Sequence, residues 1–132
     1  MIGLDANVLI RHLVQDDPRQ SAAATAFIEQ RLTVEEPGFV TAVVMGEVAW
    51  VLERIYRVRS ARLAEVLERI VQTRTLVFEH EQQVLEAVAA LALGRAAFAD
   101  ALIAAVATKA GCSHTVTFDK RASRLSGFQL IA

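Results

Sequence analysis

The sequence predicts an α/β protein with a parallel sheet, and three observations lead to this fold class. Short apolar runs that suit buried strands alternate with longer amphipathic stretches that suit helices. The chain has 132 residues and shows no repeat, linker or low-complexity segment, so residues 1–132 are expected to form a single domain. Hydrophobic residues make up 54% of the chain and charged residues 22%, which is typical of a globular protein rather than a disordered or fibrous one.

The N-terminal part is expected to fold as a strand followed by two helices. Met1–Leu4 is an apolar run that predicts a buried first strand. Asp5-Ala6-Asn7 is the predicted turn after it, and Asn7 is expected to cap a short helix that runs to Leu13. The second helix has a clear start in Asp17-Pro18-Arg19-Gln20, which combines an N-cap, a proline at the first helical position and a capping box.

The middle of the chain is expected to contain a strand and two helices. Pro37-Gly38 opens a short strand at Phe39–Val40, and Thr41 is expected to cap a long helix that runs to about Tyr56. Ser60 is expected to cap the next helix. Its apolar face follows the helical spacing i, i+3, i+4, i+7, i+8 at Leu63, Val66, Leu67, Ile70 and Val71.

The last third of the chain completes the alternation of strands and helices. The predicted elements are a third strand at Thr75–Phe78, helices at Glu81–Leu93 and Phe98–Ala110, a fourth strand at His114–Thr117 and an edge strand at Gly127–Ile131. Gly94 and Gly111 follow the two helices, and glycine commonly ends a helix because it adopts the left-handed conformation at little cost.

Charge and cysteine content limit the classes of function. The net charge of −1 gives no overall attraction to nucleic acid, so RNA binding would require a local basic patch. The single cysteine, Cys112, excludes an intrachain disulfide and a cysteine-based zinc site, and it suits a reducing cytosol. The N-terminus lacks the features of a signal peptide, and no apolar run approaches the roughly 20 residues needed to span a bilayer. We therefore expect a cytoplasmic protein without a membrane segment.

Three acidic residues are unusual because each stands alone among apolar residues. Asp5 is the only charge in the first ten residues and follows the first predicted strand. Glu47 and Asp100 are each the only charge in a long apolar stretch of a predicted helix. Their neighbours three and four residues away are apolar, so we expect both side chains to point inward. A fourth acid, Asp119, directly follows the fourth predicted strand and its apolar extension.

These four carboxylates predict a divalent metal site. The carboxyl ends of parallel strands form the binding crevice of an open sheet, so Asp5 and Asp119 are expected to meet there with Glu47 and Asp100. Each pair of carboxylates about 4 Å apart repels by roughly 4 kcal/mol at an effective dielectric constant near 20, and a cation would remove this repulsion. Oxygen ligands without cysteine or histidine favour Mg²⁺ or Mn²⁺ over zinc. The alternative is that each acid separately caps a helix or pairs with an arginine.

Four blocks of the sequence resemble the PIN-domain family, and specifically the VapC toxins of bacterial and archaeal toxin–antitoxin operons. The blocks are LDANVLIRHL, GEVAWVL, FADALIAAVATKAG and TVTFDKRASRL, which follow the order of the family and span nearly the whole chain. The resemblance implies a three-layer α/β/α sandwich with a central, mostly parallel sheet of four or five strands. Ala6 is a departure, since many members carry Thr or Ser at that position, and it removes one hydroxyl near the expected site.

The resemblance implies an endoribonuclease that depends on Mg²⁺ or Mn²⁺ and cleaves RNA phosphodiester bonds to leave a 5′-phosphate and a 3′-hydroxyl. The residues that match the catalytic, metal-binding acids of the family are Asp5, Glu47, Asp100 and Asp119. Asn7 and Thr117 match polar positions that would orient these carboxylates. The resemblance also implies a homodimer and a cognate antitoxin that covers the active-site groove.

Basic residues near the acids are candidates for contacts with RNA or with the antitoxin. They are Arg54, Arg57, Lys120 and Arg121. The alternative for the arginines between the two middle helices is an ordinary solvated turn.

Three other functions have specific sequence requirements. A haloacid-dehalogenase-like phosphatase would use Asp5 but needs a second Asp where Asn7 stands. A receiver-like regulatory module needs an acceptor Asp after the middle strand, where Glu79 and His80 stand instead. A PIN-shaped binding module without activity would lack one of the four acids, and none is missing.

Overall fold

The computed structural model describes residues 1–131, in which six α-helices alternate with five short strands. The elements in chain order are β1 (Ile2–Gly3), α1 (Ala6–Leu13), α2 (Pro18–Ala26), β2 (Gly38–Val40), α3 (Ala42–Arg54), α4 (Ser60–Val71), β3 (Leu76–Phe78), α5 (Glu81–Ala92), α6 (Phe98–Lys109), β4 (Thr115–Thr117) and β5 (Phe128–Leu130). A π-helical turn, η1 (Phe27–Arg31), continues α2, and a 3₁₀ turn, η2 (Ala122–Arg124), lies between β4 and β5. The predicted alternation of strands and helices is confirmed.

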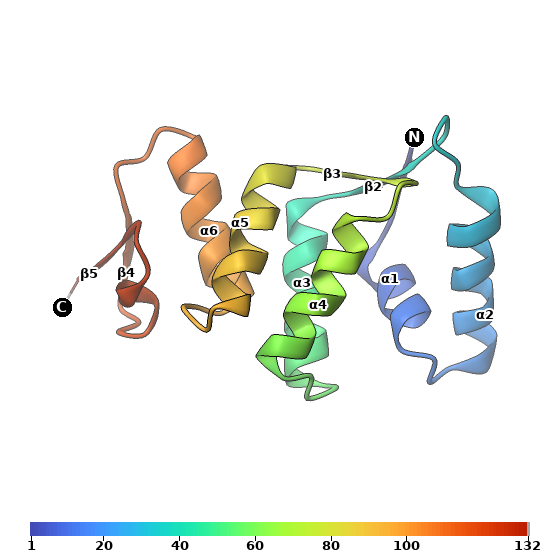
Figure 1. The fold of residues 1–132 in the computed structure, drawn as a ribbon, viewed down its shortest axis with the longest axis horizontal. Helices are drawn as coiled ribbons and strands as arrows, with labels where there is room; N and C mark the ends of the chain where they lie inside the picture. Colours follow the sequence, from blue (N-terminus) through green and yellow to red (C-terminus); the bar gives the residue numbers. More distant parts are fainter. Residues whose placement is uncertain (132) are drawn as a thin grey trace.

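The five strands are all parallel, but they form two sheets. Strands β1, β2 and β3 form one sheet in that order, and β4 pairs with β5 in the other. The expectation of one central sheet of four or five strands is wrong in this respect. In Figure 1, helices α5 and α6 stand between the β4–β5 pair and the three-stranded sheet. The start of β5 packs on α6, where the Cβ of a side chain at Gly127 would lie 3.5 Å from the Cβ of Ala104.

The helices pack around the three-stranded sheet and on one another. Helix α1 contacts α2 and α3, α3 also contacts α4 and α6, and α5 lies against both α4 and α6. The core between them is apolar, with Val40, Met45, Val48, Leu63, Leu67 and Val84 fully buried. Burial of apolar side chains is the main favourable contribution to folding, so this core fixes α3 and α6, the two helices that carry the isolated acids.

The helix starts test the local predictions. The side chain of Asp17 accepts a hydrogen bond from the backbone N of Gln20 at 3.0 Å, and that of Thr41 accepts one from the backbone N of Val44 at 3.1 Å, so both predicted N-caps are confirmed. The N-cap of α1 is Asp5 rather than Asn7, because the Asp5 carboxylate already accepts the backbone N–H of Ala6 at 2.7 Å.

The start of α4 also differs by one residue from the prediction. Arg59 occupies the N-cap position in an extended conformation, and Ser60 is the first helical residue. No side chain caps this helix, so its first-turn N–H groups lack that partner.

No helix within residues 1–131 is both long enough and apolar enough to cross a lipid bilayer.

Candidate active site

Two of the four isolated acids lie on helices, and the other two lie just after strands. Asp5 ends the turn from β1 into α1, and Asp119 lies two residues after β4, so both follow the carboxyl end of a strand as predicted. Glu47 lies in the middle of α3, and Asp100 in the first turn of α6. Each acid is therefore positioned by regular structure rather than by a long loop.

The expectation that Glu47 and Asp100 both point inward is wrong for Glu47. Asp5, Glu47 and Asp119 are exposed, whereas Asp100 is partly buried. The reason is clearest for α3. The buried face of this helix is formed by Met45, Val48, Ala49 and Leu52. Glu47 lies on the outer face with Val43 and Trp50, which are 80% and 55% exposed, so apolar neighbours in the sequence did not indicate a buried position.

Asp100 is the least exposed of the four acids. Partial burial is the main cause that raises its pKa, and the negative charge of Asp119 raises it further. Arg121 opposes this effect and lowers the pKa of Asp100, while Glu53 on α3 raises it. The charges of Asp100, in α6, and of Asp119, just after the next element β4, therefore influence each other.

Asp119 is held by local hydrogen bonds. Its backbone N–H donates to Oγ1 of Thr117 at 3.0 Å, and its Oδ1 accepts from the backbone N–H groups of Arg121 at 2.8 Å and Ala122 at 3.3 Å. Within residues 1–131, Oδ2 of Asp119 accepts no hydrogen bond. The hydroxyl of Thr117 thus holds the backbone of Asp119 in place, and Oδ2 of Asp119 stays available for a ligand.

Asn7 is placed differently from Thr117. It lines a pocket of about 400 Å³ between β1, α1 and α2, and no hydrogen bond joins its side chain to Asp5 within residues 1–131. Its predicted role in orienting a carboxylate stays a prediction.

The comparison with known families identifies the chain. The sequence model of the PIN domain matches residues 2–127, a range that includes all four isolated acids. The chain belongs to the PIN-domain family. PIN domains have a three-layer α/β/α fold and are generally nucleases that depend on divalent metal ions, so the predicted fold class is confirmed. A search among curated proteins finds no significant match.

The acids of this PIN domain have the chemistry that a divalent ion requires. The predicted meeting of all four carboxylates in one group is not found within residues 1–131. Carboxylate oxygens are the ligands that Mg²⁺ and Mn²⁺ prefer. Asp100 and Asp119 interact, yet no three acidic, histidine or cysteine side chains within residues 1–131 form one group that could hold a metal. The interacting pair is therefore the nucleus of the candidate site.

One of the predicted basic residues, Arg121, lies beside this pair, because its backbone N–H donates to Oδ1 of Asp119 at 2.8 Å. Arg57 and Arg121 line one pocket, and Arg54 lies next to Glu53 with 3.6 Å between Nε and the carboxylate. Contacts of these arginines with RNA or an antitoxin stay a prediction. Lys120 is exposed. Sequence reasoning missed Glu53 because its neighbour Arg54 made it resemble an ordinary surface acid.

Arg95 was also missed by sequence reasoning. It lines a second pocket with Arg121, in the connection between α5 and α6. The one signal for it was position, since it is the last cation before the apolar stretch that contains Asp100.

The raised pKa of Asp100 predicts a small, pH-dependent gain in stability for Asp100→Asn in metal-free protein. Above the folded-state pKa the ionised carboxylate disfavours the folded protein, and this cost disappears as the pH falls through that pKa. We expect the variant to unfold with a free energy higher by less than about 1 kcal/mol near neutral pH, because solvent screens a partly exposed group. Urea denaturation in EDTA measures this difference.

The difference should shrink when the same measurement is made at acidic pH. Glu29→Gln, which changes an exposed acid on η1, is the matched control and should alter the free energy of unfolding little. A variant at position 100 that is less stable than the wild type near neutral pH would contradict the prediction.

Proposed function

We propose that this PIN domain is an endoribonuclease of the VapC toxin type that depends on Mg²⁺ or Mn²⁺. The observation that carries the proposal is the family match over residues 2–127, because it includes all four acids of the predicted site. A PIN domain that had become a binding module without activity would be expected to lack one of them. The sequence resemblance further supports a cytoplasmic homodimer that a cognate antitoxin neutralises.

Each acid has a proposed role in holding the ion. Asp5, Glu47, Asp100 and Asp119 would supply oxygen ligands, and Asp100 and Asp119 would form the first part of the site because they already interact. A bound divalent ion supplies an activated water and stabilises negative charge on the phosphate. Thr117 would keep Asp119 oriented through the hydrogen bond at 3.0 Å, and Asn7 would act beside Asp5.

The alternative of a metal-dependent phosphatase is separated from the proposal by one experiment. The purified chain is incubated with cellular RNA and, separately, with a generic phosphate-monoester substrate, each with Mn²⁺ or with EDTA. We expect internal cleavage of RNA that requires Mn²⁺ and no release of phosphate from the monoester. Release of phosphate without RNA cleavage, or RNA cleavage that EDTA leaves unchanged, would overturn the proposed function.

Divalent ions should also raise the melting temperature of the protein. A ligand that binds only the folded state stabilises it, by about 2.7 kcal/mol when its free concentration is 100 times the Kd. Differential scanning fluorimetry with millimolar Mg²⁺ or Mn²⁺ measures the shift, and the double variant Asp5→Asn with Asp100→Asn is the control that should lose it. Melting curves unchanged by both ions would count against a metal site.

A further inference from the structure

Five arginines surround two adjoining pockets at one end of the molecule, although the chain as a whole has a net charge of −1. They are Arg57, Arg59, Arg95, Arg121 and Arg124. None of them takes part in the ion pairs found within residues 1–131. A group of guanidinium ions without carboxylate partners repels itself, so an anionic ligand would stabilise this arrangement.

The first pocket has a volume of about 420 Å³ and lies where two helices begin. Arg57, Arg59 and Arg121 line it, together with the start of α4 at Ser60 and the residue before α6, Ala97. Neither helix has a side-chain cap, so first-turn N–H groups with their partial positive charge are available at this pocket. Glu53 also lines the pocket as its one carboxylate, against three guanidinium groups.

The backbone at Arg57 is unusual in this region. Arg57 has a φ of 59°, a left-handed conformation that is uncommon for a residue other than glycine. Such conformations are concentrated at binding and catalytic sites, where the surrounding structure maintains them. Here the conformation turns the chain between α3 and α4 at the wall of the pocket.

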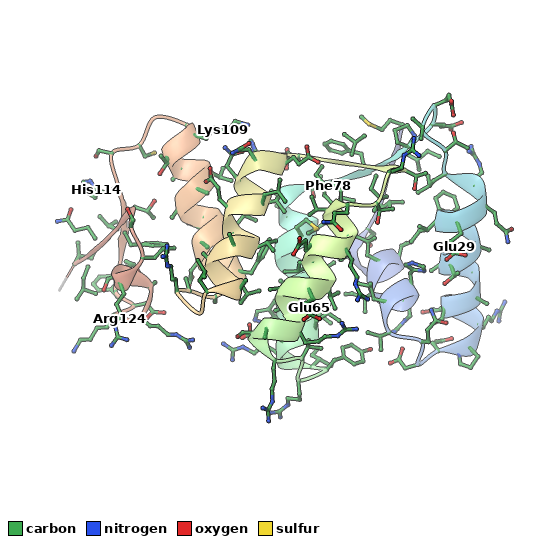
Figure 2. The ribbon with its side chains drawn as sticks, in the orientation of Figure 1. Glu29, Glu65, Phe78, Lys109, His114 and Arg124 are labelled. Carbon is green, nitrogen blue, oxygen red and sulfur yellow. The ribbon has the colours of Figure 1, made fainter. Side chains whose placement is uncertain are left out.

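The second pocket has a volume of about 480 Å³ and adjoins the first, because Gly94 and Arg121 line both. Arg95 and Arg124 supply its other cations. In Figure 1 the α3–α4 connection, the α5–α6 connection and the loops of the β4–β5 segment lie at the same lower end of the molecule. Arg124 extends from that end in Figure 2.

Arg121 connects both pockets to the acid pair. Its backbone N–H donates to Oδ1 of Asp119 at 2.8 Å, and its positive charge acts on Asp100. A chain of phosphates that ran through both pockets would therefore pass Arg121, the residue that contacts Asp119 and acts on Asp100.

We propose that the two pockets bind two phosphates of one single-stranded RNA chain next to the bond that is cleaved, with Arg121 between them. This inference rests on the proposed nuclease function and names the part of the substrate that each pocket holds. The guanidinium group matches phosphate through two parallel hydrogen bonds, and free N–H groups at a helix start also bind phosphate. An acidic protein segment is disfavoured because binding to a protein usually depends on aromatic anchors and the pockets that receive them, and no aromatic side chain lines these pockets.

RNA binding without cleavage tests the proposal. The full chain is kept in EDTA, and fluorescence anisotropy measures its affinity for a short labelled single-stranded RNA over a series of salt concentrations. We expect Arg59→Ala and Arg121→Ala each to weaken binding roughly three- to tenfold, the effect of one lost charged contact to phosphate. Each should also reduce the slope of log affinity against log salt by about 0.7, the value for one charge on single-stranded nucleic acid.

Two further variants serve as comparisons. One tests whether the paired hydrogen bonds of Arg121 matter beyond its charge, and the other tests an exposed arginine outside the pockets. Arg121→Lys keeps the charge but loses the paired hydrogen bonds, so it should bind RNA with intermediate affinity. Arg74→Ala is the matched control, since Arg74 is exposed and follows the far end of α4, a 12-residue helix that spans roughly 18 Å. It should bind RNA like the wild type.

The outcomes distinguish this inference from the proposed function. Equal RNA binding by Arg121→Ala and Arg74→Ala would overturn the phosphate pockets, even if the wild type cleaves RNA with Mn²⁺. If Arg59→Ala and Arg121→Ala lost the binding of a polyglutamate peptide that the wild type shows, but bound RNA like the wild type, the pockets would be assigned to an acidic protein. This result would also overturn the proposal. Weakened RNA binding by the pocket variants, in a protein that never cleaves RNA, would support the pockets and reject the nuclease.

Discussion

Asp100→Asn should lower Mn²⁺-dependent RNA cleavage by at least about 100-fold while the protein stays folded. The expected size follows from metal enzymes in which loss of a residue that only supports a ligand already costs about 10- to 100-fold. Asn has nearly the same size as Asp, so it preserves the packing at the start of α6 but removes the negative charge that the ion requires. Measurement of kcat/KM with a labelled RNA gives the effect, and circular dichroism shows whether the helices persist.

Asp5→Asn tests the same site from a different element and should cause a similar loss. A higher concentration of Mn²⁺ should restore part of the activity of either variant, because the main defect is weaker ion binding. Glu29→Gln serves as the control, since this exposed acid on η1 should be dispensable for cleavage. Cleavage at the wild-type rate by Asp5→Asn or Asp100→Asn would show that the site is assigned wrongly.

Phe98→Ala should reduce the free energy of unfolding by about 3–5 kcal/mol, the usual cost of truncating a buried phenylalanine. Phe98 is 1% exposed and belongs to the main core, two residues before Asp100 in the first turn of α6. Its removal leaves a cavity where α6 packs on the other helices. Urea denaturation measures the loss, and the start of α6 should become less well ordered.

The matched control is a phenylalanine on the surface. Phe118 is 78% exposed, so Phe118→Ala should change the free energy of unfolding by no more than about 0.5 kcal/mol. Similar effects of the two substitutions would contradict the packing described for α6.

Much of the secondary structure is predictable because its signals are local. The N-caps at Asp17 and Thr41 depend on residues only three positions away, and the apolar spacing of α4 is visible in its own twelve residues. The start of α1 was misplaced because Asp5 and Asn7 are both good capping residues, and the sequence does not show which side chain accepts the first free N–H group.

The burial of the acids was less predictable. Apolar neighbours surround Glu47 in the sequence on both faces of α3, and only the packing of Val48 and Leu52 into the core shows which face is inside. Large apolar residues such as Val43 and Trp50 on the outer face conceal the amphipathic pattern. Asp100 is partly buried in the first turn of α6, and the charges that act on it come from α3 and from the segment after β4.

The amino-acid order by itself determined the kind and sequence of the elements, the four isolated acids and the family to which their blocks belong, because periodicity, capping and motifs involve residues close together in the chain. The tertiary structure decided that five parallel strands divide into two sheets, that the charge of Asp119 acts on Asp100, and that arginines from three connections gather at one end. Strands of two or three residues carry too few side chains to specify which edges pair. Contacts between distant segments depend on how whole helices pack, which no local pattern records.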